Sequence, residues 1–245
     1  MHVFYTPKLS GNFYILNEEE SKHCARSLRL PIGETVQLID GEGGYYLAKL
    51  AENSPKACIL EILSNVQDYG KRNYWLHIAI APTKNIDRFE WFLEKATEIG
   101  IDEITPIYCD HSERKQIKPE RLEKILVSAA KQSINAFLPK LNEMTDFKKL
   151  VNQLDSAVTY IAHCADGTKT ALSEIRNEQT TVLIGPEGDF SQKEIDLCRE
   201  KGITEVSLGN SRLRTETAGI VACHTVCLVN NLSNISISSG KSGKY

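Results

Sequence analysis

Two short apolar strands, each followed by a glycine-bearing turn, decide the fold: TVLIGPEGDFS at residues 181–191 and VSLGNSRLRTETAG at residues 206–219. The first turn leads into a helix whose expected N-cap is Ser191, with Glu194 three residues on to complete a capping box. A strand that ends in such a turn exposes backbone groups at the carboxyl edge of a sheet, where open α/β sheets bind ligands. Together the two turns predict the walls of one pocket.

Either turn alone would be better interpreted as an ordinary tight turn whose glycines serve positive φ angles. The second turn, however, is crowded with charged side chains, which favours a binding site. The sequence lacks the G-x-G-x-x-G and G-x-x-x-x-G-K-[ST] patterns of nucleotide-binding loops. A phosphate cradle is therefore not expected at either turn.

Strands and helices alternate on both sides of these turns. We expect strands at 74–80, 103–108, 157–163, 180–184 and 204–208, and helices at 85–100, 119–135, 192–201 and 216–231. In helix 85–100 the apolar residues recur at steps of three and four, and Gly100 ends the helix. The alternation predicts an α/β domain with a mostly parallel sheet over residues 71–232.

Residues 1–70 have a different rhythm, with apolar β-favouring runs at 2–5, 13–16, 34–40, 45–51 and 56–64. One helix is expected at 18–28, and Asp40–Gly44 is typical of a hairpin turn. Five strands and one helix predict a small barrel. The domain boundary is placed in the polar segment 66–73, and a flexible tail is expected at 233–245 because it is rich in Ser, Gly and Lys.

Composition narrows the functional classes. The net charge of −3 means that any nucleic-acid contact must come from local basic patches. The seven cysteines form no C-x-x-C pair, so no disulfide framework is expected. Cys223, His224 and Cys227 have helical spacing, but the adjacent Cys223 and His224 point to different faces and small cysteines suit a buried helix, so no metal site is expected. The amino-terminal pattern and the absence of a long apolar run predict neither a signal peptide nor a membrane helix. The cysteine usage favours the reducing cytoplasm.

The runs LIGPEGDFS (183–191) and LGNSRLRTETAG (208–219) resemble the signature loops of the RsmE family. These SPOUT-superfamily enzymes methylate N3 of a uridine in small-subunit ribosomal RNA. The likeness extends to His23–Leu30 with Gly33, to DRFEWFLEKATEIG (87–100) and to AAKQS (129–133). Two departures stand out: the family usually has a glycine where Asp189 stands, which we expect to change little, and often an arginine shortly after the AxQS run.

The resemblance implies a PUA-like β-barrel at 1–70 that binds RNA, and a SPOUT domain at 71–232 with a deep trefoil knot. It also implies a homodimer, ribosomal RNA of the small subunit as partner, and S-adenosylmethionine as cofactor. The cofactor would lie against the two turns and the strand end near His163. The residues expected to bind it are His163, Leu183, Ile184, Gly185, Pro186, Glu187, Gly188, Leu208, Gly209, Ser211, Leu213, Arg214, Thr217 and Ala218.

Methylation at N3 removes an imino proton and spreads negative charge onto the uracil oxygens. Arg214 is the expected stabiliser of that charge, because arginine stays protonated and cannot serve as the base. Glu187 and Glu216 are the candidate bases, or partners that orient the arginine. Alternatively, Glu216 favours a helix N-terminus, Glu187 is a solvated loop charge, and His163 is a packed structural residue.

Contacts to RNA phosphates are expected from two basic patches and one loop residue. Lys22, Arg26 and Arg29 recur at helical spacing beside His23. Arg114, Lys115, Lys118 and Arg121 form the second patch, and Arg212 lies in the glycine turn. Two other functions remain open: a catalytically silent RNA-binding dimeric module, and a nucleotide-dependent oxidoreductase, which the missing fingerprint disfavours. Binding of S-adenosylmethionine distinguishes the silent module from the enzyme.

Overall fold

The computed structural model describes residues 1–235, which form two compact units. The first unit comprises Met1–Lys71 together with Val127–Leu138, and the second comprises Arg72–Leu126 and Pro139 onward. The linear division expected from the sequence does not anticipate that 127–138 join the first unit. Residues 236–245 of the expected tail lie outside the described residues, and Ser233–Ile235 continue the last helix.

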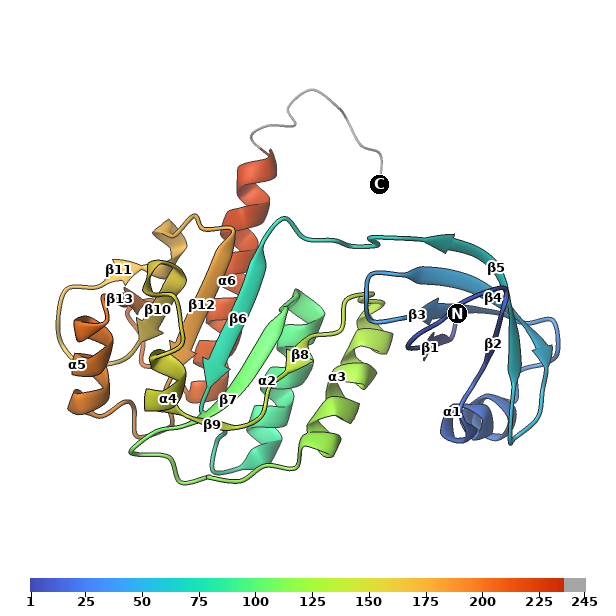
Figure 1. Ribbon diagram of the computed structural model, residues 1–245, viewed down its shortest axis with the longest axis horizontal. Coiled ribbons are helices and arrows are strands. Elements are labelled where there is room, and N and C mark those ends of the chain that lie inside the picture. The colour runs from blue at the N-terminus through green and yellow to red at the C-terminus, as the bar shows by residue number, and fades with distance from the viewer. Residues whose placement is uncertain (236–245) are drawn as a thin grey trace. The chain divides into compact units, whose positions relative to one another are not determined.

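The first unit is a curled sheet of five strands in the order β1-β3-β4-β5-β2 (Figure 1). Its strands are β1 (Val3–Tyr5), β2 (Phe13–Ile15), β3 (Thr35–Ile39), β4 (Tyr45–Glu52) and β5 (Ile59–Val66). The expected hairpin joins β3 to β4, where Asp40 Oδ1 accepts the backbone N–H groups of Glu42 and Gly44 at 2.7 and 2.8 Å. Apolar side chains of alternate strand positions fill the unit's core.

The expected helix at 18–28 is formed in two parts. An α-helix, α1 (Glu18–Lys22), continues as a π-helix over His23–Leu28, and Arg29 ends it with a φ of 51°. Because a π-helix turns more slowly than an α-helix and Arg29 lies beyond the last helical residue, the expected cations do not follow a single α-helical stripe. Lys22, Arg26 and Arg29 are nevertheless all exposed.

The second unit is built on a sheet in the order β11-β13-β10-β12-β6-β7-β8, and β9 pairs with β7. The strands are β6 (Trp75–Ile80), β7 (Glu103–Tyr108), β8 (Lys140–Leu141), β9 (Thr145–Asp146), β10 (Thr159–Ala162), β11 (Thr170–Ala171), β12 (Gln179–Ile184) and β13 (Thr204–Ser207). All these pairings are parallel, as predicted.

Helices cover both faces of this sheet (Figure 1). One face carries α2 (Ile86–Ile99) and α6 (Thr215–Ile235), which pack closely because a Cβ at Gly219 would lie 2.7 Å from the Phe92 ring. The other carries α4 (Phe147–Val151) and α5 (Gln192–Glu200), whose apolar residues share a core with Ile161 and Leu183. The helix α3 (Pro119–Ser133) follows β7, and short 3₁₀ turns occupy Ser156–Val158 and Leu172–Glu174.

Parallel pairing places the carboxyl ends of β10, β12 and β13 at one edge of the sheet. Residue Ala162 of β10 lies opposite Ile184 of β12 and Val206 of β13. The turns that follow these three strands therefore start side by side. Within residues 1–235, no helix is both long and apolar enough to cross a lipid bilayer.

Candidate cofactor and active site

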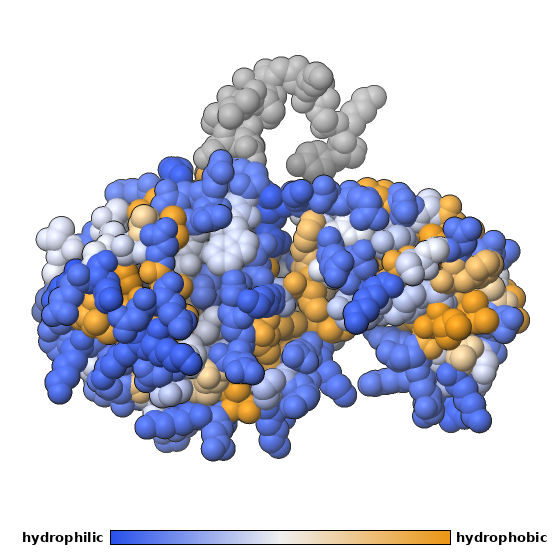
Figure 2. Space-filling view, in the orientation of Figure 1, coloured by the Kyte–Doolittle hydropathy of each residue, from blue (hydrophilic) through white to orange (hydrophobic). Residues whose placement is uncertain are grey.

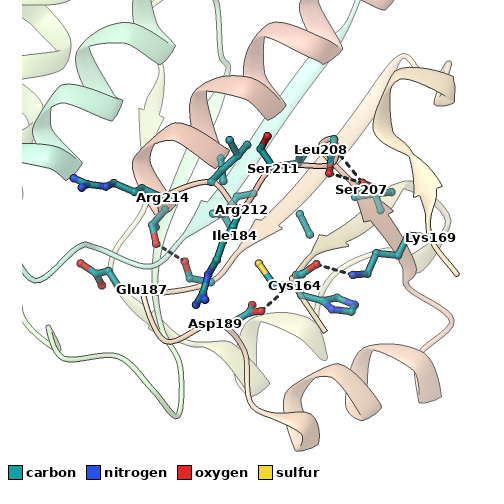
Figure 3. A pocket seen from close by; sticks show the side chains of 18 of the residues that line it. Cys164, Lys169, Ile184, Glu187, Asp189, Ser207, Leu208, Ser211, Arg212 and Arg214 are labelled. Carbon is teal, nitrogen blue, oxygen red and sulfur yellow. Dashed lines mark hydrogen bonds between the residues drawn. The ribbon is translucent and has the colours of Figure 1, made fainter. Parts of the chain in front are cut away.

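The turns after β10, β12 and β13 enclose one cavity of about 630 Å³ (Figure 3). Two of these turns are the glycine-bearing segments singled out in the sequence, so they do share a pocket. The residues that line the cavity are Ala162, His163, Cys164, Lys169, Ile184, Gly185, Pro186, Glu187, Asp189, Val206, Ser207, Leu208, Gly209, Asn210, Ser211, Arg212, Leu213, Arg214, Thr215 and Ala218.

The expected cofactor set falls largely on this lining. Leu183, Gly188 and Thr217 are the exceptions, since they do not line the cavity. Leu183 is a fully buried core residue of β12. Gly188 faces the side chain of His111, whose Cβ lies 3.0 Å from where a Gly188 Cβ would be.

The turn after β12 is fixed by hydrogen bonds at both ends. Ser191 caps α5, and the capping box with Glu194 is present as predicted. Glu194 also accepts the backbone N–H of Asp110 at 2.9 Å, and His111 Nδ1 lies 3.1 Å from the carbonyl oxygens of Gly188 and Asp189. The turn therefore has a defined shape before any ligand arrives.

The loop after β13 connects directly to α6. Gly209 has a φ of 127°, a conformation that a side chain would oppose. The first residue of α6, Thr215, donates its Oγ1–H to the carbonyl of Gly185 at 3.1 Å. This hydrogen bond joins the second glycine turn to the first on the buried side of the cavity.

The turn after β10 forms the third wall. His163 Nε2 lies 2.6 Å from Glu205 Oε2, and burial lowers the pKa of the His163 imidazole. Arg199 binds the same carboxylate and is the main reason why the Glu205 pKa is lowered. The neutral imidazole therefore donates Nε2–H to Glu205, while Nδ1 has no hydrogen-bond partner among the described residues.

The three catalytic candidates do not share one environment. Arg214 and Glu187 line the cavity, and Figure 3 shows both on the side opposite Lys169. Glu187 Oε1 accepts the backbone N–H of Lys84 at 2.9 Å. Glu216 is 7% exposed, does not line the cavity, and has Arg88 Nη1 at 3.8 Å. Arg214 and Glu187 therefore lie in the cavity lining, whereas the Glu216 carboxylate is buried outside it.

The expected RNA-binding residues differ in whether their side chains already make contacts within the protein. Lys22, Arg26, Arg29 and Lys115 are all exposed, and Lys22 also pairs with Glu18 at 2.6 Å. Hydrophilic side chains gather over α1 (Figure 2). Arg114 instead donates to the carbonyl oxygens of Thr83 and Lys84 at 3.0 and 2.7 Å, so its guanidinium already holds a loop.

His23 is exposed beside Lys22, and Arg212 is an exposed residue of the cavity lining. In Figure 3 the Arg212 side chain extends across the cavity toward the side of Asp189. Among residues 1–235, no group of three or more His, Cys, Asp or Glu side chains is arranged to hold a metal ion. Cys223 is fully buried, and burial raises the pKa of its thiol.

Sequence reasoning missed the charged residues of the third wall. Lys169 Nζ donates to the carbonyl oxygens of His163 and Ala165 at 2.8 and 2.5 Å, and Cys164 is exposed in the cavity. Only the turn-forming pair Asp166-Gly167 after a strand end signalled that a third loop lies here. Asp189 also lines the cavity, although the sequence alone gives no sign that its carboxylate takes part in the site.

Two protein-family models match the chain. A family model described as an RNA methyltransferase domain matches residues 71–227, and one described as an RNA methyltransferase PUA domain matches residues 16–63. A ribosomal RNA small subunit methyltransferase E from Mesomycoplasma hyopneumoniae is 30% identical over 225 residues, which are 90% of this chain and 96% of the relative. These matches confirm the resemblance seen in the two loops.

Solved structures of similar proteins have the same fold. A probable rRNA-methyltransferase from Porphyromonas gingivalis is 36% identical with a TM-score of 0.88, covering 95% of this chain and 100% of its own. A Legionella pneumophila protein described as a methyltransferase, solved in complex with the bound cofactor SAM, is 26% identical with a TM-score of 0.82 and coverages of 91% and 96%. Both carry the same two-part architecture over nearly the whole chain.

Proposed function

The chain belongs to the RNA methyltransferase family, and on that premise we propose that it transfers a methyl group from S-adenosylmethionine to N3 of a uridine in small-subunit ribosomal RNA. One observation carries the proposal: three neighbouring strand ends enclose a single cavity that bears Arg214 and Glu187 on one side. The relative from Mesomycoplasma hyopneumoniae is named for small-subunit ribosomal RNA, and the Legionella pneumophila protein holds SAM.

The cavity fits this cofactor chemically. Its volume of about 630 Å³ lies within the usual range for sites of small ligands. Ile184, Val206 and Leu208 offer an apolar wall for an adenine ring, and the strand ends offer backbone N–H and C=O groups to its edge. Charged side chains at the rim suit a zwitterionic tail. When bound, S-adenosylmethionine supplies an electrophilic methyl carbon on its sulfonium.

The residues of this chain account for the remaining requirements of the reaction. The Arg214 guanidinium stabilises the negative charge that spreads onto the uracil oxygens as N3 loses its proton. Glu187 Oε2, whose partner oxygen is held by Lys84 N–H, is the candidate acceptor of that proton. Binding both reactants in one cavity supplies the alignment that the transfer needs.

We further propose that the first unit binds RNA through the exposed cations around α1, and that the enzyme works in the cytoplasm as a homodimer with a knotted carboxyl-terminal domain. Neutralising Lys22, Arg26 and Arg29 together should weaken RNA binding and flatten its dependence on salt. An unchanged salt slope in a filter-binding titration would remove these residues from the RNA surface. His23, beside Lys22, and Lys115 of the second unit are proposed as further contacts to RNA.

The deciding experiment follows the methyl group. Purified small subunits that lack the modification are incubated with the protein and S-adenosylmethionine labelled in its methyl group, and the nucleosides are separated after digestion. Label in N3-methyluridine supports the proposal. Label in another nucleoside would overturn the assigned position, and tight cofactor binding without any transfer would favour a silent RNA-binding module.

A further inference from the structure

Asp189 occupies a backbone conformation that favours glycine. Its φ is 63°, in the left-handed region. Among residues with side chains, aspartate and asparagine enter this region at the lowest cost. The backbone therefore accepts aspartate here, but it does not require the carboxylate.

The carboxylate binds two backbone N–H groups from different turns. Oδ2 accepts the N–H of Cys164 at 2.7 Å, and Oδ1 accepts the N–H of Asp189's own neighbour, Phe190, at 2.8 Å. The pairing of β10 with β12 ends at Ala162 opposite Ile184. Asp189 thus joins the turns after these two strands beyond the point where the sheet holds them together (Figure 3).

The turn that Asp189 grips is held from its other side by Lys169. Lys169 Nζ donates to the carbonyl oxygens of His163 and Ala165, on either side of the N–H group that Asp189 accepts. Both charged residues line the cavity, and Cys164 does too. A carboxylate on the N–H and an ammonium on the two carbonyls fix the third wall of the cavity.

We propose that Asp189 is a positioning residue that preorganises the cofactor cavity by tying the turn after β10 to the turn after β12. The proposal rests on the proposed function, because the ligand is taken to be S-adenosylmethionine. A wall that is already ordered costs less to order on binding, so the tie raises affinity for the cofactor. It does not touch the reacting atoms, so the rate at saturating cofactor does not depend on it.

Three variants separate the carboxylate from the backbone. Asp189→Gly removes both hydrogen bonds while it relieves the left-handed conformation. Asp189→Asn keeps an acceptor oxygen for Cys164 and tolerates the same conformation. Asp166→Asn removes a negative charge from an exposed residue of the same loop that does not line the cavity, and serves as the control.

Calorimetric titration of each full-length variant with S-adenosylmethionine gives the test. Loss of a charge-assisted hydrogen bond predicts that Asp189→Gly raises the Kd about tenfold. Asp189→Asn should lie between this variant and the wild type, and Asp166→Asn should match the wild type. With small subunits as substrate, Asp189→Gly should raise KM for the cofactor and leave kcat unchanged. Hydrogen exchange of the peptide containing Cys164 should accelerate in Asp189→Gly alone.

The outcomes also separate this inference from the proposed function. If the wild type binds S-adenosylmethionine and Asp189→Gly binds it equally well or better, the tie is not a determinant of affinity and the inference is overturned. A fall in kcat with unchanged KM would overturn it as well, because the residue would then act on the chemistry. If the wild type binds no S-adenosylmethionine, the proposed function fails first.

Discussion

Replacing Thr215 by valine tests the contact that joins the two glycine turns. Thr215 is 5% exposed and begins α6, and its Oγ1 lies 3.1 Å from the carbonyl oxygen of Gly185, which is also buried. Valine has the same shape as threonine but cannot donate a hydrogen bond. The change therefore removes one interaction and leaves the carbonyl of a cavity residue without its partner.

Two opposing effects set the magnitude. A buried carbonyl left without a donor costs about 1–3 kcal/mol. The methyl group that replaces the hydroxyl gains about 0.8 kcal/mol from its burial. The loss prevails, so the free energy of unfolding should fall by about 1 kcal/mol. Since Gly185 lines the cavity, we expect a comparable loss in cofactor binding, or a Kd about fivefold higher.

Thr215→Ser is the matched control, because it keeps the hydroxyl and removes the methyl. The two variants should have similar urea midpoints, measured at one protein concentration, but different affinities for S-adenosylmethionine. Calorimetry should find Thr215→Ser close to the wild type and Thr215→Val weaker. The reasoning is refuted if Thr215→Val binds as tightly as the wild type, or if the serine variant is the weaker binder.

Three more outcomes are expected. Arg214→Ala should abolish methyl transfer to small subunits while calorimetry finds cofactor binding largely intact; full activity would remove Arg214 from the mechanism. Gly219→Ala should lower the melting temperature, because the added methyl group overpacks against the Phe92 ring at a cost of about 1–3 kcal/mol. This cost exceeds the gain of about 1 kcal/mol from alanine's better helix propensity. A higher melting temperature would contradict this. Burial lowers the pKa of His77 from 6.5 to about 4, so the unfolded chain takes up a proton before the folded protein does as the pH falls. The free energy of unfolding should therefore drop by up to about 3 kcal/mol between these two pH values, and it should drop more in the wild type than in His77→Gln. Urea midpoints that shift equally in both proteins between pH 7 and pH 4.5 would refute this.

The long elements of the second unit could be predicted because each has a complete local signal. The expected helix at 85–100 is found at Ile86–Ile99, with Asn85 as its N-cap and Gly100 at a φ of 113°. The expected strand at 180–184 is found at Gln179–Ile184. In both elements, the spacing of the apolar residues and the residues at the ends predict the same structure that is found, so tertiary contacts do not change the local preference.

The short elements between α3 and β10 could not be predicted, because they carry no complete local signal. The strands β8 and β9 have two residues each and α4 has five, which is too short for any period to show. The paired strands exist because β7 offers them hydrogen bonds, and α4 exists because Phe147 is buried in the core beneath the sheet. These are tertiary causes that one segment's sequence does not contain.

At the cavity, only the turns with glycines close to the strand ends could be predicted to form part of the site. The turns after β12 and β13 contain glycines close to the strand ends, and both were identified. The turn after β10 has none until Gly167, so its contribution to the cavity was limited to His163. Lys169 and Asp189 act through backbone carbonyl and N–H groups, and partners of this kind leave no trace in residue types.

The two candidate bases can be ranked by their access to the cavity. Glu216 follows Thr215, whose hydrogen bond to Gly185 anchors the first turn of α6, and the Glu216 carboxylate is buried outside the cavity lining. Glu187 already lies in the cavity lining, where its Oε1 accepts the backbone N–H of Lys84. A base must meet its proton within hydrogen-bond distance, so we propose Glu187 for proton removal and leave Glu216 to orient Arg88 at the edge of α2.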